Sequence, residues 1–253
     1  MIQKRTIPTD SVIEKLDFLL SKNDYLAAKV HLLFWLKEAE NGSDGKGELL
    51  IANELMGLCR KLSQRDEAIK YSQKALSTVK KLGIEQNVGA ATTYLNSATV
   101  YKAFGRAEDS IDLFQKAKEI YENNLNANDD RLAGLYNNMA LALVDLKRFL
   151  EARELYEKAI NVLKQNKGKE PEQAITYLNL ASAAEAEHGL LDAEELISLN
   201  IEKAMQLLDS VKEREDGNYA FVCEKCASVF GYYGFFHYEK ELTERYRRIY
   251  ERA

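Results

Sequence analysis

The sequence contains little proline and little cysteine. Only two prolines, Pro8 and Pro171, occur among 253 residues, and both lie where a helix could begin. Because proline costs about 3 kcal/mol inside a helix, this scarcity indicates an almost entirely helical chain. The three cysteines are few and odd in number, which argues against a disulfide-stapled scaffold. Such low cysteine usage is typical of a reducing compartment, so we expect a cytoplasmic location.

The chain also lacks a strong basic cluster and a long apolar run. Its net charge is -5, and acidic residues lie close to its two short basic segments, at residues 80–81 and 245–248. Nucleic-acid binding normally needs a basic face, so we expect no nucleic-acid partner. No apolar stretch reaches the roughly 20 residues that cross a bilayer. The first residues lead into a polar stretch, which predicts neither a signal peptide nor a membrane partner.

A pattern that recurs about every 42 residues runs through most of the chain. Small or compact side chains return at three places of this repeat. They are Met56, Ala98, Ala140 and Ala181 at the first place, Ala68, Ser110, Ala152 and Ala193 at the second, and Ala75, Ala117 and Ala159 at the third. A fixed period of this length is typical of stacked helical units, each in contact only with its neighbours. Such arrays usually bind other molecules along a long surface.

Each repeat is predicted to be a helical hairpin. In residues 131–165 apolar residues follow helical spacing up to Leu146, and a second apolar stripe starts at Phe149. Small residues such as Ala140 and Ala159 are expected where two helix axes come close. By analogy with stacked repeat arrays we predict an all-α, right-handed α-solenoid of about six antiparallel helix pairs in one domain, residues 1–253. The units are predicted at residues 9–41, 48–82, 90–123, 131–166, 172–210 and 217–253.

Two of the units resemble the tetratricopeptide repeat (TPR). The residues that carry the resemblance are Tyr94, Ala98, Tyr101, Gly105, Phe114 and Ala117 in one unit, and Tyr136, Ala140, Phe149, Ala152, Tyr156 and Ala159 in the next. The standard TPR period is 34 residues, so these units carry about eight more, as in kinesin light chain and the LGN type of scaffold. The resemblance implies a TPR superhelix whose first helices line a concave groove that holds an extended peptide.

Asparagines recur in the helices that the resemblance places on the groove. Asn96, Asn138 and Asn179 occupy one place in three successive first helices, and Asn53 and Asn137 lie one place earlier in theirs. Asparagine is only a middling helix former, so its recurrence is not explained by propensity. Its amide both donates and accepts hydrogen bonds. Two roles therefore remain open, gripping a peptide backbone or bonding neighbouring helices.

Charged residues near the ends of the same helices suggest a graded groove. Arg60 and Lys102 are basic, whereas Asp145 and Glu185, further along the chain, are acidic. If these side chains face inward, a groove that runs from basic to acidic would orient a bound segment of opposite gradient. Ordinary solvated charge is the alternative.

Three other features invite a functional interpretation. Residues 41–47 are glycine-rich, but they lack the spacing of a phosphate-binding loop and are expected to form a flexible turn. Cys223 and Cys226, with His237 nearby, offer only three ligands where zinc needs four, so we expect core packing and no metal or other cofactor. The last unit is rich in aromatics, which predicts a cap and also allows a homodimer surface.

We therefore predict a non-catalytic scaffold that binds a protein or an extended peptide. The alternatives are a signalling-peptide sensor of the bacterial TPR-regulator type, without its own DNA-binding domain, and an enzyme with a site near Cys223 and His237. No nucleophile, base and orienting acid group together in the sequence, which favours the non-catalytic prediction.

Overall fold

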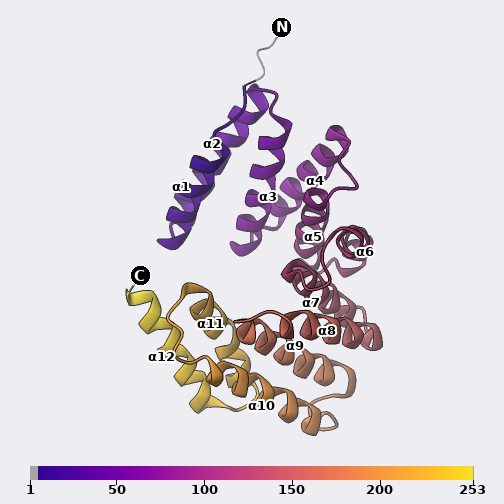
Figure 1. The fold of residues 1–253 in the computed structure, drawn as a ribbon, viewed down its shortest axis with the longest axis vertical. Coiled ribbons are helices and arrows are strands. Elements are labelled where there is room, and N and C mark those ends of the chain that lie inside the picture. Colours follow the sequence, from indigo (N-terminus) through magenta and orange to yellow (C-terminus); the bar gives the residue numbers. More distant parts are fainter. Residues whose placement is uncertain (1–4, 253) are drawn as a thin grey trace. The chain divides into compact units, whose positions relative to one another are not determined.

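The fold consists of helices alone in the part of the chain that the computed structural model describes, residues 5–252. Twelve α-helices form six antiparallel pairs, each pair joined by a short turn (Figure 1), so the predicted all-α fold of six pairs is confirmed. The helices are α1 (Thr9–Ser21), α2 (Tyr25–Asn41), α3 (Gly45–Lys61), α4 (Arg65–Leu82), α5 (Val88–Ala103), α6 (Ala107–Asn124), α7 (Asp130–Asp145), α8 (Phe149–Lys164), α9 (Glu170–His188), α10 (Glu194–Ser210), α11 (Gly217–Tyr232) and α12 (Phe236–Arg252).

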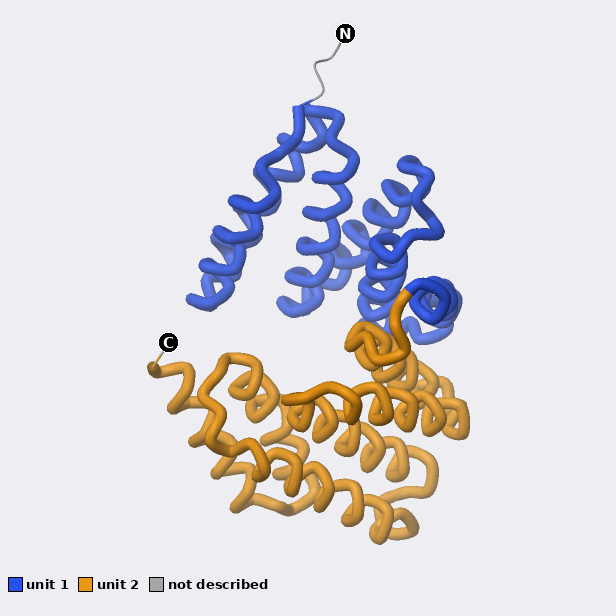
Figure 2. Tube along the Cα trace, viewed as in Figure 1, with its two compact units in different colours: residues 1–124 blue, residues 125–253 orange. Residues whose placement is uncertain are grey.

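The chain divides into two compact units, residues 1–124 and residues 125–253 (Figure 2). We call them unit 1, with helices α1–α6, and unit 2, with helices α7–α12. Each unit has a hydrophobic core of its own, around residues such as Leu32, Leu55 and Met56 in unit 1 and Ile201, Cys223 and Phe230 in unit 2.

The residues that recur at the three places of the repeat, small except for Met56, are buried, as the repeat pattern predicts. Every member of the three small-residue sets has no exposed surface. Large side chains such as Phe114 and Tyr156 are equally buried beside them. Small side chains allow the helix axes to approach, and the large ones fill the space that remains.

Apart from α1, the first helices of successive pairs contact one another inside each unit. In unit 1, α3 packs against α5, and in unit 2, α9 packs against both α7 and α11. Among the described helices, second helices do not pack against one another to a comparable extent. The first helices α3 and α5 in unit 1, and α7, α9 and α11 in unit 2, therefore each form a wall, and the side chains on these first-helix walls are the candidates for binding.

The glycine-rich segment at residues 41–47 contains the predicted turn, at residues 42–44 between α2 and α3, whereas the flexibility of this turn stays a prediction. Helix α3 already begins at Gly45, and the buried Asp44 caps it by accepting the Gly47 N–H at 3.0 Å. The other Asp44 oxygen accepts the Ile7 N–H, also at 3.0 Å. A Cβ at Gly42 would lie only 2.2 Å from the Arg5 carbonyl oxygen. Glycine is present because the N-terminal segment passes directly over this turn, which the local sequence does not reveal.

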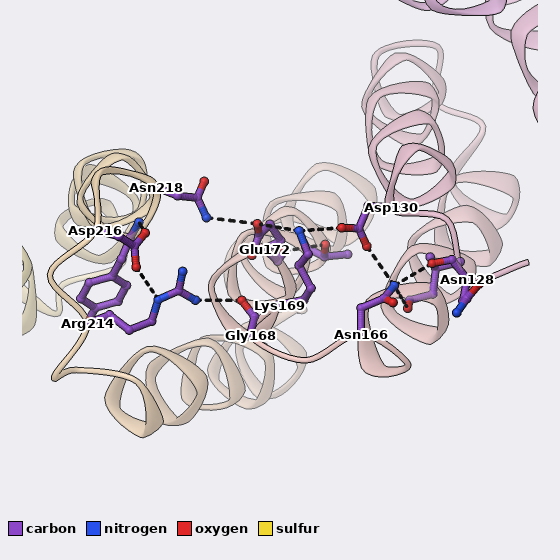
Figure 3. A network of polar contacts seen from close by, with 12 residues as sticks. Asn128, Asp130, Asn166, Gly168, Lys169, Glu172, Arg214, Asp216 and Asn218 are labelled. Atoms are coloured by element: carbon purple, nitrogen blue, oxygen red, sulfur yellow. Dashed lines mark hydrogen bonds and ion pairs between the residues drawn. The ribbon is translucent and has the colours of Figure 1, made fainter. Parts of the chain in front are cut away.

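A chain of polar contacts joins the loops of unit 2 (Figure 3). The Arg214 guanidinium donates to the Gly168 carbonyl oxygen at 2.8 Å and to the Asp216 carboxylate at 2.7 Å. The Lys169 ammonium lies 2.6 Å from the Asp130 carboxylate. These contacts connect the N-terminal ends of α7, α9 and α11, and so they help to hold successive first helices in register.

Asp216 provides a pH-dependent test of this network. It caps α11 by accepting the Tyr219 N–H at 3.0 Å, and the Arg214 hydrogen bond, outweighing partial burial, lowers its pKa. Because its folded-state pKa lies below the unfolded value, about 3.9, its charge stabilises unit 2 above that pH and stops doing so as the pH falls through the folded pKa. We expect Asp216→Ala to cost about 1 kcal/mol at pH 7.

Urea denaturation followed by circular dichroism at pH 7 and at pH 2 measures this difference. The wild type and Asp216→Ala should differ in unfolding free energy at pH 7 and converge at pH 2. The control is Asp192→Ala, because Asp192 is exposed and makes no hydrogen bond or ion pair within residues 5–252. A gap of the same size at both pH values would contradict the role of the Asp216 charge.

Candidate functional site

The first-helix wall of unit 1 contains a small cavity between α3 and α5, with a volume of about 160 Å³. Three predicted site residues, Asn53, Arg60 and Asn96, lie together on its surface. The complete lining is Asn53, Glu54, Met56, Gly57, Arg60, Asn96 and Thr99. The cavity is therefore mostly polar, and it is smaller than the roughly 300 Å³ at which ligand pockets usually begin.

Two asparagine amides connect the walls of this cavity. The Asn53 side-chain amide donates to the Thr93 hydroxyl at 3.1 Å, and the Asn96 amide donates to the Asn53 side-chain oxygen at 3.1 Å. Both bonds run between α3 and α5. The sequence leaves two roles open for these asparagines, binding a peptide backbone or bonding neighbouring helices. The Asn53 amide bonds the neighbouring helix. Asn96 also bonds its neighbour, but its oxygen and second N–H make no hydrogen bond within the described chain.

The same arrangement recurs incompletely in unit 2. The Asn137 amide on α7 donates to the Thr176 hydroxyl on α9 at 2.8 Å, which repeats the bond from Asn53 to Thr93. The Asn137 oxygen is buried and accepts no hydrogen bond in the described chain. Asn138 donates only to the Gly134 carbonyl of its own helix, at 2.8 Å. The Asn179 side chain makes no hydrogen bond within residues 5–252, so neither the Asn138 nor the Asn179 side chain joins two helices.

Charged groups on the unit 1 cavity lack ion-pair partners in the described chain. Burial, together with the nearby Asp17 carboxylate, raises the pKa of Glu54. Arg60 is exposed, and the partial burial of its guanidinium lowers its pKa. Two partly desolvated charges of opposite sign are thus available to a ligand. A perturbed pKa in a cleft is a common mark of a functional site.

Glu54 is a cavity residue that the sequence reasoning missed. It occupies in α3 the repeat place that Asn96, Asn138 and Asn179 occupy in later first helices. The alignment of the repeats indicates position 54 as a site position. Because this position holds glutamate and not asparagine, Glu54 was not recognised from the asparagine pattern.

The remaining predicted site residues lie near the ends of first helices. Lys102 is half-buried in the last turn of α5, and Asp145 is the exposed last residue of α7. Glu185, near the end of α9, accepts hydrogen bonds from the hydroxyls of Tyr232 at 2.5 Å and Tyr233 at 2.7 Å. These bonds connect α9 with the end of α11. A groove graded from basic to acidic stays a prediction.

The cysteines of the last pair are core residues, as expected. Cys223 and Cys226 are buried in unit 2, and burial raises the pKa of both thiols. His237 is exposed at the start of α12. Within the described residues, no three histidine, cysteine, aspartate or glutamate side chains group as metal ligands. None of the described helices combines the length and hydropathy that a bilayer crossing requires.

The aromatic side chains of the last pair fall into two groups. Tyr219 and Phe230 are fully buried and close the core of unit 2. Phe221, Phe236 and Tyr250 are exposed, by 46%, 69% and 45%. The first group fits the expected cap, whereas a homodimer through the second group stays a prediction.

Comparisons with known sequences agree with this geometry. A family model described as tetratricopeptide repeat matches residues 48–123 and 131–197, together more than half of the chain. Protein KINESIN LIGHT CHAIN-RELATED 2 from Arabidopsis thaliana is 26% identical over 145 residues, which are 57% of this chain and 22% of that protein. This chain thus spans less than a quarter of that relative's length.

Solved structures show the same fold at low sequence identity. BtubC (BKLC) from P. vanneervenii has a TM-score of 0.59 at 19% identity, and the match covers 87% of this chain and 89% of that one. Nearly identical TPR-like repeats from Podosopora anserina have a TM-score of 0.55 at 19% identity, with 80% and 94% covered. A Rap protein complexed with competence and sporulation factor has a TM-score of 0.55 at 13% identity, with 94% and 73% covered.

Proposed function

Because this chain belongs to the tetratricopeptide repeat family, we propose that it is a non-catalytic protein that binds an extended peptide segment along its first helices. Stacked helical repeats present long preformed surfaces, and this supports a protein or peptide partner. A preformed wall loses little conformational entropy when it binds a ligand. The proposal includes a cytoplasmic location and no cofactor.

The unit 1 cavity is the single observation that carries this proposal. Its volume, about 160 Å³, suits one side chain or a short stretch of backbone rather than a whole metabolite. Glu54 and Arg60 on its wall are not paired within the described chain, so they can pair with groups of a ligand. Asn96 adds an amide oxygen and one N–H, which match the N–H and C=O of a peptide backbone.

The asparagines that join no helices allow a test that separates binding from folding. Peptides are first selected on the wild-type protein from a phage-displayed random peptide library. We expect Asn138→Ala combined with Asn179→Ala to weaken the binding of the selected peptides about thirtyfold, since each of the two lost hydrogen bonds costs about 1 kcal/mol. The urea midpoint should change little, because neither amide bridges two helices. Isothermal titration calorimetry and circular dichroism measure the two quantities.

Asn200→Ala is the matched control for this test. The Asn200 amide donates to the Leu196 carbonyl of its own helix at 2.8 Å, as Asn138 does in α7, but it lies on a second helix, α10. Its removal should leave peptide affinity unchanged. If the double variant unfolded while its affinity per folded molecule stayed intact, the proposed binding role of these asparagines would be wrong.

A second candidate function is that of a signalling-peptide sensor. The likeness to a Rap protein complexed with competence and sporulation factor, which covers 94% of this chain, favours it. A sensor must change shape or oligomeric state when its ligand binds, whereas a scaffold need not. Sedimentation velocity with and without a selected peptide distinguishes the two. Only a sensor would change its sedimentation coefficient by more than the added mass of the peptide explains.

A further inference from the structure

The Glu185 carboxylate is held by two phenols and by no cation. Each of its oxygens accepts one hydrogen bond, from the hydroxyl of Tyr232 at 2.5 Å and from that of Tyr233 at 2.7 Å. A carboxylate has about four acceptor positions, so two remain for a ligand. Some neighbouring carboxylates of unit 2 are paired with basic side chains, for example Glu187 with Arg153 at 3.3 Å. Glu185 has no such partner within residues 5–252.

The two tyrosine rings stand beside this carboxylate. The Tyr232 ring is 68% exposed, and its centroid lies 4.9 Å from that of Tyr233 with an interplanar angle of 78°. An exposed aromatic face attracts cations, because the ring presents negative charge above its plane. The hydroxyl bonds fix the rings and the carboxylate relative to one another, so a ligand would not have to order them.

We infer that Glu185, Tyr232 and Tyr233 form a binding site for a guanidinium group, the side chain of an arginine in a bound peptide. The planar guanidinium can stack on a ring while it donates to the free positions of a carboxylate, which the compact lysine ammonium does less well. The claim that the guanidinium belongs to a peptide rests on the proposed function. The claim that this site binds a guanidinium group does not. The site gives the first-helix wall of unit 2 a preference for basic segments.

A small probe tests the site without any knowledge of the natural partner. The full chain, labelled with nitrogen-15, is titrated with N-acetyl-arginine amide and followed by NMR. N-acetyl-citrulline amide, nearly the same in shape but neutral, is the control ligand. We expect millimolar binding of the arginine amide, with shifts of the amide signals near Glu185 and Tyr232, and no saturable shifts with the citrulline amide.

Two variants and a charge-matched control complete the test. Glu185→Gln should weaken the binding of the arginine amide about fivefold, and Tyr232→Ala should weaken it about threefold. Glu195→Gln removes one exposed acid from α10 and should have no effect. The thermal melting of each variant shows whether it is folded, and a glutamine at position 185 can still accept one tyrosine hydroxyl.

The outcomes separate this inference from the proposed function. Equal binding of the two amides, or unchanged binding to Glu185→Gln, would overturn the site and mean that the tyrosines only tie α11 to α9. Selection of peptides without a basic residue would leave the proposed function intact and count against the arginine preference. Binding of the arginine amide together with failure of every library peptide would support the site and contradict peptide binding.

Discussion

Replacing Arg245 with alanine should lower the free energy of unfolding by about 2 kcal/mol, because it removes a buried side chain whose guanidinium joins Asp209, Tyr219 and Glu241. The Arg245 side chain on α12 is only 7% exposed. Its guanidinium lies 2.7 Å from the Asp209 carboxylate, donates to the Tyr219 hydroxyl at 3.0 Å, and also pairs with Glu241. Burial alone would lower the pKa of Arg245, but these three partners outweigh it and raise the pKa.

Two further variants show which property of Arg245 matters. Arg245→Met keeps the alkyl stem and removes the charge, so it should recover only the packing part of the loss. Arg247→Ala is the control, since Arg247 is exposed on the same helix and forms no ion pair among the described residues. It should change the unfolding free energy by less than about 0.5 kcal/mol. Urea denaturation measures the free energy of unfolding of all three variants. If Arg245→Ala lost no more unfolding free energy than Arg247→Ala, the stabilising role of the Arg245 contacts would be contradicted.

Replacing Ala98 with leucine should destabilise unit 1 by about 2 to 3 kcal/mol. Ala98 lies in α5, has no exposed surface, and occupies the first place of the small-residue repeat. A leucine adds three carbon atoms where helices are in contact, so side chains must leave their preferred rotamers or the helices must separate. The separation would also disturb the hydrogen bonds that connect α3 with α5.

Ala103→Leu is the matched control for this prediction. Ala103 is the last residue of the same helix and is exposed, so a leucine there has room. We expect its unfolding free energy to stay within about 0.5 kcal/mol of the wild type. The urea midpoints of the two variants give the comparison. Equal stability of Ala98→Leu and the wild type would mean that the small residues do not set the helix spacing.

The sequence anticipates the fold well, because the relevant signals are local. Helical spacing of apolar residues, as from Phe149 to Leu163, follows from the turn of the helix alone. Recurring small residues such as Ala98 and Ala140 mark helix contacts wherever the repeat occurs. The contact of Gly42 with Arg5 was not anticipated for the opposite reason, since Arg5 is distant from this turn along the chain.

The candidate site is less predictable. Asn96 and Asn138 occupy the same place of the repeat, yet the amide of one bonds Asn53 of the neighbouring helix pair and the amide of the other bonds only its own helix. The Arg245 cluster and the two tyrosines on Glu185 were not anticipated either. Their partners lie far apart along the chain, and nothing in a local pattern indicates which polar side chains will meet.

The amino-acid order by itself thus determined the helices, their pairing and the repeat family, because these depend on periodic contacts between near neighbours. The tertiary structure decided which polar groups are used inside the protein and which stay available. That outcome depends on the distance between neighbouring helices, since a shift of about 1 Å makes or breaks a hydrogen bond. It separates Asn96, whose amide bonds the neighbouring helix, from Asn138 and Asn179, which occupy the same place of the repeat and join no helices.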